Sequence, residues 1–146
     1  MKIARPMSVL GFLVASTVIA QDAKVIPLMS KDLAECPGKE GQMITVVYPP
    51  GAKDPIHRHN AHAFVYVLEG SVVMQVKGGK EVTLTPGQTF YEGPNDIHTV
   101  GRNASSTEPA KFIVFFVKDK GAPILVPVNP TVSDVSASPK SNSEPK

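Results

Sequence analysis

The stretch Gly51–Gly70, GAKDPIHRHNAHAFVYVLEG, carries three of the chain's four histidines within six residues, directly before an apolar run. His57 and His59 are two positions apart, and residues two apart on a strand project from the same face. Two imidazoles side by side can share one metal ion, and imidazole suits Fe, Mn, Ni, Cu and Zn. A His-x-His pair is also common among ordinary surface residues, so its meaning depends on the surrounding sequence.

The sequence on both sides of this stretch reads as a series of short strands. Runs rich in β-branched and aromatic residues alternate with turn residues at intervals of about 8–12 residues, which is typical of an all-β sandwich or barrel. The predicted strands span 42–48, 63–69, 71–77, 81–85, 88–92, 96–100 and 111–117. Gly78-Gly79 predicts a hairpin, because such a turn requires positive φ. A turn near Lys31–Cys36 is the one place with any helical signal. We expect a folded domain over residues 25–128.

Two segments of this β pattern resemble the two motifs of the cupin superfamily. The first segment begins at Gly51, which is followed after five residues by the His57-x-His59 pair. The segment ends at the turn glycine, Gly70. The later segment GQTFYEGPNDIHTVGRN resembles the second motif, with Gly87 eleven positions before His98. The resemblance implies a small jelly-roll (cupin) β-barrel. It also implies a metal ion inside the barrel's mouth, with His57, His59 and His98 as its ligands.

The first motif departs from the family at its glutamate, which falls at Ala63 and has no ligating group. The neighbouring His62 is a candidate fourth metal ligand, or a proton carrier in catalysis. Strand alternation places His62 and Ala63 on opposite faces, although a turn separates His59 from this strand. The expected site therefore holds three or four neutral nitrogens and leaves the ion its full charge, which favours anionic substrates. Glu92 and Asp96 either orient a histidine or are solvated turn residues.

The ligand set resembles that of cupins whose three-histidine iron sites make them dioxygenases. This implies an oxidoreductase acting on a small anionic or enolisable organic substrate. The expected cofactor is a divalent first-row transition metal, iron first, with Mn, Ni, Cu or Zn as alternatives. Two other classes remain open, a non-catalytic module that binds a metal or small ligand, and a metal-dependent isomerase or lyase using the metal as a Lewis acid.

The two ends of the chain differ in composition from this domain. Residues 1–20 combine Lys2 and Arg5 with an uncharged apolar run, the layout of a secretory signal peptide cleaved after Ala20. We therefore expect a secreted or periplasmic protein without stable membrane insertion, the alternative being an uncleaved anchor. Residues 129–146 are rich in Pro and Ser and are expected to form a disordered tail.

The composition also limits the partners. Without Lys2 and Arg5, the chain has 13 basic and 13 acidic side chains, so it lacks the excess of positive charge that nucleic-acid binding requires. Cys36 has no second cysteine in the chain with which to form a disulfide. The runs 63–69 and 111–117 are apolar on both faces, so we expect a further layer of structure to cover the second face of these strands. This layer is either the N-terminal strand or a second subunit, and we expect a homodimer.

Overall fold

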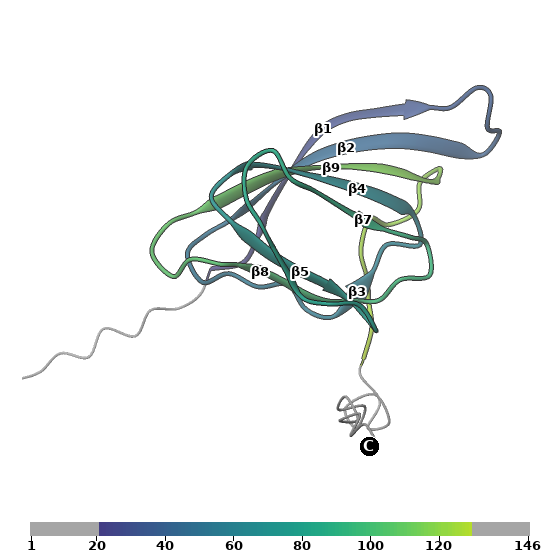
Figure 1. Cartoon of the computed structure of the whole chain (residues 1–146). Coiled ribbons are helices and arrows are strands. Elements are labelled where there is room, and N and C mark those ends of the chain that lie inside the picture. The colour runs from purple at the N-terminus through teal and green to yellow at the C-terminus, as the bar shows by residue number, and fades with distance from the viewer. Residues whose placement is uncertain (1–20, 130–146) are drawn as a thin grey trace, which may run out of the picture.

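The computed structural model describes residues 21–129, which form two antiparallel β-sheets (Figure 1). The predicted signal peptide and all of the predicted tail beyond Asn129 lie outside these residues. The strands are β1 (Lys24–Asp32), β2 (Lys39–Tyr48), β3 (His57–Arg58), β4 (His62–Glu69), β5 (Val72–Val76), β6 (Val82–Leu84), β7 (Thr89–Glu92), β8 (His98–Asn103), β9 (Ala110–Asp119) and β10 (Val126–Pro127). Residues 21–129 contain no helix, and so none that is long and apolar enough to cross a membrane.

The strand order is that of a jelly roll. One sheet has the order β1-β2-β9-β4-β7 and the other β10-β3-β8-β5-β6, so sequence neighbours such as β3 and β4 lie in different sheets. The predicted all-β jelly-roll fold is confirmed. The predicted hairpin at Gly78-Gly79 is also confirmed, since β5 and β6 pair antiparallel and Gly78 has a φ of 81°.

The core lies between the two sheets and follows from strand alternation. On β9 every second residue from Ala110 to Lys118 is buried, and the buried Phe112 and Val114 pair with Val46 and Ile44 of β2. The smaller sheet adds buried side chains to the same cluster: Val72, Met74 and Leu84. Removing each such side chain from water contributes about 1.5–3 kcal/mol. This core fixes the register of the strands that carry the site.

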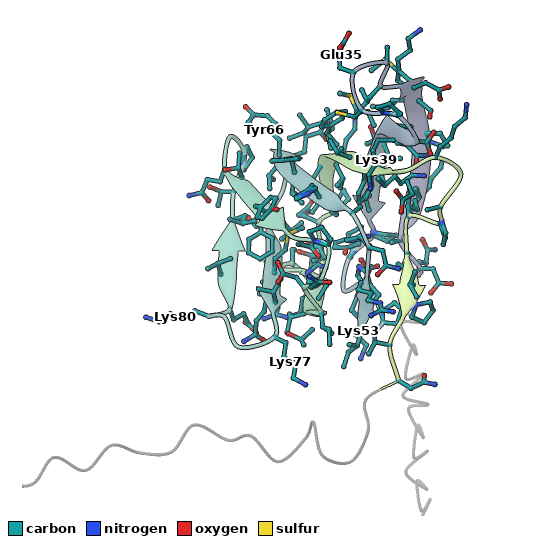
Figure 2. All side chains as sticks on the ribbon, turned by 90° about the vertical axis from the view of Figure 1, so that its right-hand side faces the viewer. Glu35, Lys39, Lys53, Tyr66, Lys77 and Lys80 are labelled. Carbon is teal, nitrogen blue, oxygen red and sulfur yellow. The ribbon has the colours of Figure 1, made fainter. Side chains whose placement is uncertain are left out.

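The other face of the larger sheet is apolar, and no further layer formed by residues 21–129 covers it. We call it the outer face and define it by Phe64 and Tyr66 of β4, Tyr91 of β7, and Ile113 and Phe115 of β9. Phe64, Tyr66 and Tyr91 are 48%, 47% and 48% exposed, and the Tyr66 side chain points away from the strands (Figure 2). The N-terminal strand does not supply the covering layer that the sequence calls for, because β1 extends the edge of the sheet beside β2.

The segment after β9 returns across the barrel and closes it near β3. Val126 and Pro127 of β10 pair with Arg58 and His57. The turn before this segment is held by Lys118, a buried side chain whose Nζ donates to the Ala122 carbonyl at 2.6 Å and to Glu40. In this segment, the backbone carbonyl of Ile124 contacts His59 of the site.

Candidate metal centre

Four side chains from three strands converge inside the barrel. They are His57 on β3, His59 just after it, Glu92 at the end of β7 and His98 at the start of β8. One ligand atom from each lies within 4.8 Å of the others. His57 and His98 are cross-strand partners in the β3–β8 pair, and antiparallel partners project to the same side of the sheet. The structure thus brings together the three histidines expected as metal ligands.

Backbone carbonyls fix the orientation of the first two imidazoles. His57 Nδ1 lies 2.8 Å from the Pro55 carbonyl, and His59 Nδ1 contacts the Ile124 carbonyl. Because a carbonyl only accepts hydrogen bonds, Nδ1 is the protonated nitrogen in each ring. The two Nε2 atoms then face each other at 3.2 Å. Two metal–nitrogen bonds of about 2.1 Å at a right angle would place their nitrogens roughly 3 Å apart, so this pair fits a shared cation.

The other two side chains complete a donor set that fits a metal. Glu92 Oε2 and both ring nitrogens of His98 are buried without a hydrogen-bond partner among residues 21–129. Glu92 Oε2 lies 3.3 Å from His98 Nδ1 and 3.5 Å from His59 Nε2. Buried polar atoms without partners are costly in a folded protein, and a bound cation would satisfy the Glu92 oxygen and one of the two His98 nitrogens. Three imidazoles and one carboxylate suit a first-row transition metal.

Glu92 corrects the expectation of a site without a carboxylate. Ala63, at the family's glutamate position, is the direct cross-strand partner of Glu92 in the β4–β7 pair. The two residues therefore face the same side of the sheet, and the small Ala63 side chain leaves room for the carboxylate from the next strand. Glu92 is only 3% exposed, so it is not a solvated turn residue. The inward direction of Glu92 could be read from the sequence, because alternation along β7 places Phe90 and Glu92 on the inner face.

Burial sets the protonation of the centre. Burial raises the pKa of Glu92 to about 8, with smaller contributions from Asp96 and Asp54. Burial lowers the pKa of His59 to about 4 and that of His98 to about 3, in each case helped by the neighbouring His57. At neutral pH these two imidazoles are thus neutral and able to donate to a metal, whereas Glu92 of the metal-free protein retains its proton.

The structure does not bring His62 into this centre. His62 lies on the exposed face of β4, where its Nδ1 is 2.7 Å from the Tyr91 hydroxyl. The strand turns Ala63 inward and His62 outward, so the geometry supports neither a fourth histidine ligand nor a proton carrier at the site. Asp96 is a turn residue whose Oδ2 accepts a hydrogen bond from the Gly93 amide at 2.7 Å. Cys36 is free and exposed.

A small cavity of about 70 Å³ adjoins the four side chains. Its wall consists mostly of apolar side chains from both sheets and from the segment before β10: Ala23, Val25, Ile44, Val46, Val65, Met74, Phe112, Val114, Phe116, Ile124 and Leu125. Since a water position needs about 10–15 Å³, this volume accommodates a molecule of roughly five or six non-hydrogen atoms. An apolar cavity with a few convergent polar groups is the usual form of a small-molecule site.

The fold and the site define a jelly-roll protein with a three-histidine, one-carboxylate centre. The sequence profile of the Cupin domain family matches residues 44–116. The chain belongs to the cupin family. A comparison with curated protein sequences finds no significant match.

Several solved structures share this fold. The chain is 22% identical to a DMSP lyase from Ruegeria pomeroyi over 60% of its length and 42% of that chain, with a TM-score of 0.53. It thus spans less than half of that enzyme. A polyketide cyclase from Streptomyces resistomycificus is 18% identical over 79% of this chain and 77% of its own, with a TM-score of 0.57. An oxalate oxidase in complex with the substrate analogue glycolate is 25% identical over 71% of this chain and 54% of its own, with a TM-score of 0.55.

Proposed function

We propose that this cupin is a metal-dependent oxidoreductase of dioxygenase type, acting on a small anionic organic substrate. The observation that carries the proposal is the approach of the Nε2 atoms of His57 and His59 to 3.2 Å, beside a Glu92 Oε2 atom that has no hydrogen-bond partner among the described residues. These polar atoms are buried with few hydrogen-bond partners of their own, which is costly in a folded protein. The arrangement is therefore explained most directly by a metal ion that all four side chains hold.

Each residue has a distinct part in this proposal. His57, His59 and His98 would donate neutral nitrogens, and the carbonyls of Pro55 and Ile124 hold the first two rings in the required tautomer. Glu92 would add a single negative charge and give up its proton when the metal binds. A first-row transition metal, with iron as the first candidate, would supply Lewis acidity and one-electron redox chemistry with dioxygen.

Charge and size support the choice of substrate. A divalent ion and one carboxylate leave a net positive centre, which favours a carboxylate or enolate at the remaining positions. The cavity of about 70 Å³ admits a molecule of roughly five or six non-hydrogen atoms. Glycolate, the analogue bound to the oxalate oxidase that resembles this chain, is of this size. The proposed substrates are thus short carboxylic acids or similarly small enolisable compounds.

Oxygen consumption tests the proposal. Purified protein would be loaded with Fe(II) or Mn(II) and offered short carboxylic acids, thiols and diketones in an oxygen-electrode assay. We expect substrate-dependent oxygen uptake in the wild type and none in His59→Ala. Turnover of a substrate without oxygen uptake would indicate an isomerase or lyase instead. Metal binding with no turnover of any compound would indicate a binding module.

We also propose that the protein is exported and acts as a homodimer. Mass spectrometry of protein expressed in a secreting host should find a mature N-terminus at Gln21, whereas an intact Met1 would refute cleavage. For the dimer, Phe64, Tyr66 and Tyr91 together would bury on the order of 300 Å² if a second copy covered them. A stable interface needs about 800 Å² per partner, so the contact would extend across β9 to the exposed Met29 of β1.

A further inference from the structure

One hydrogen-bonded polar pair on the cavity wall has no part in the metal centre. Apart from the four candidate ligands, the cavity wall formed by residues 21–129 has two polar side chains, Tyr48 and Asp54. The Tyr48 hydroxyl donates a hydrogen bond to Asp54 Oδ2. Tyr48 is completely buried at the end of β2, and its ring meets the edge of Phe112 at 5.1 Å. One hydroxyl and one carboxylate in an otherwise apolar wall offer a specific place for a polar part of a ligand.

Gly101 brings this pair close to the metal centre. A Cβ atom at Gly101 would lie 3.1 Å from the Tyr48 hydroxyl, 3.1 Å from His98 Cε1 and 3.4 Å from Asp54 Oδ2. The Tyr48 hydroxyl oxygen and His98 Cε1 are therefore no further apart than the sum of their two distances from this Cβ position. The backbone supports the same arrangement, because the Asp54 amide donates to the Gly101 carbonyl at 2.8 Å. Gly101 thus lies between the pair and His98 without a side chain that would push them apart.

We propose that Tyr48 and Asp54 form a second anchor of the substrate site, which binds a hydroxyl group of a short hydroxy acid whose carboxylate lies at the metal centre. This inference rests on the proposed function and specifies its substrate class. The Tyr48 hydroxyl has already donated its hydrogen to Asp54, so its oxygen is free to accept one. Asp54 Oδ1 accepts no hydrogen bond from the described residues and is a second acceptor.

The chemistry of the pair selects a hydroxyl over other groups. Two acceptors call for a donor, which a hydroxyl supplies and a methyl group does not. A neutral hydroxyl is also cheaper to transfer into this apolar cavity than an ammonium group, whose desolvation costs far more. The cavity's size agrees, because a two- or three-carbon hydroxy acid has roughly five or six non-hydrogen atoms.

Ligand affinity measures this anchor without turnover. The protein, loaded with one equivalent of Co(II), would be titrated calorimetrically with two matched pairs of acids, glycolate against acetate and 3-hydroxypropionate against propionate. One hydrogen bond to this pair should favour at least one hydroxy acid over its partner by about tenfold or more. Tyr48→Phe and Asp54→Asn should each remove most of that preference, measured as the ratio of the two affinities within a pair.

Three further variants separate the possible failures. Tyr66→Phe, the same substitution on the outer face, should retain the preference, and Gly101→Ala should reduce it by intruding between the pair and His98. Circular dichroism and bound Co(II) would verify that each variant is folded and loaded. A wild type with equal affinity within both pairs, or a preference that survives both Tyr48→Phe and Asp54→Asn, would overturn the anchor while the metal centre stands. Failure to bind Co(II) would instead overturn the proposed function.

Discussion

Glu92→Gln should stabilise the metal-free protein and weaken its response to metal. The buried carboxyl has its pKa raised from 4.5 to about 8. Below pH 4.5 this carboxyl is protonated in both the folded and the unfolded protein, and its contribution to stability is fully present. As the pH rises from 4.5 towards 8, the unfolded chain loses this proton before the folded protein does, and the contribution is lost. The loss at pH 7.5 covers about three pH units, or about 4 kcal/mol at 1.36 kcal/mol per unit. Glutamine has a similar shape and does not ionise, so it avoids this loss.

Urea unfolding of chelator-treated protein would measure this effect. We expect the free energy of unfolding of Glu92→Gln to exceed that of the wild type by about 4 kcal/mol at pH 7.5 and by less than about 0.5 kcal/mol at pH 4.5. Titration of the buried histidines affects both proteins equally and cancels in the comparison. Adding metal at one hundred times its dissociation constant for the wild type should stabilise the wild type by about 2.7 kcal/mol and stabilise the variant, which keeps three histidines but lacks the carboxylate, by less.

Glu69→Gln is the matched control, because the Glu69 side chain is 69% exposed. Its substitution should change stability by less than about 1 kcal/mol at either pH. A metal-free Glu92→Gln that is less stable than the wild type at pH 7.5 would refute the reasoning, since Glu92 would then stabilise the fold as an ordinary ionised side chain.

Three further predictions concern pH, the turns and assembly. Metal affinity should rise about tenfold per pH unit up to pH 8 and level off above it, because binding displaces the Glu92 proton; metal titrations at pH 6 to 9 showing no such slope would contradict this. Gly70→Ala should destabilise the protein more than Gly51→Ala does in urea unfolding. Both glycines have positive φ, which costs an alanine about 1–2 kcal/mol, but only at Gly70 would the new Cβ also lie 2.4 Å from the Pro109 carbonyl oxygen. Replacing Phe64 and Tyr66 together with serine should halve the mass measured by light scattering, whereas an unchanged mass would place any interface elsewhere.

The strands of the core followed from sequence because alternation and turn residues are local signals. The predicted strand at 111–117 became β9, Ala110–Asp119, and the predicted strand at 63–69 became β4, His62–Glu69. The two-residue strands β3 and β10 were not predictable, because each exists only through pairing with a distant partner, Val126 with Arg58 and Pro127 with His57. A two-residue segment carries no periodicity of its own.

The site was predicted in part for the same reason. His57, His59 and His98 lie in motifs that can be read along the chain. Glu92 was considered as an orienting or turn residue, since its role depends on the pairing of β7 with β4, which places it opposite Ala63. The alternation of β7 indicates only that Glu92 faces inward, and no motif along the chain relates it to the histidines. The cross-strand register is the information that the sequence lacked.

Elemental analysis of purified protein tests the central claim most directly. The account predicts close to one transition-metal ion per chain in the wild type, either as isolated or after incubation with Fe, Mn, Ni, Cu or Zn and removal of excess. It predicts close to none in His57→Ala that retains the wild-type circular dichroism spectrum. Folded wild-type protein that remains free of metal after incubation with all five ions would contradict it.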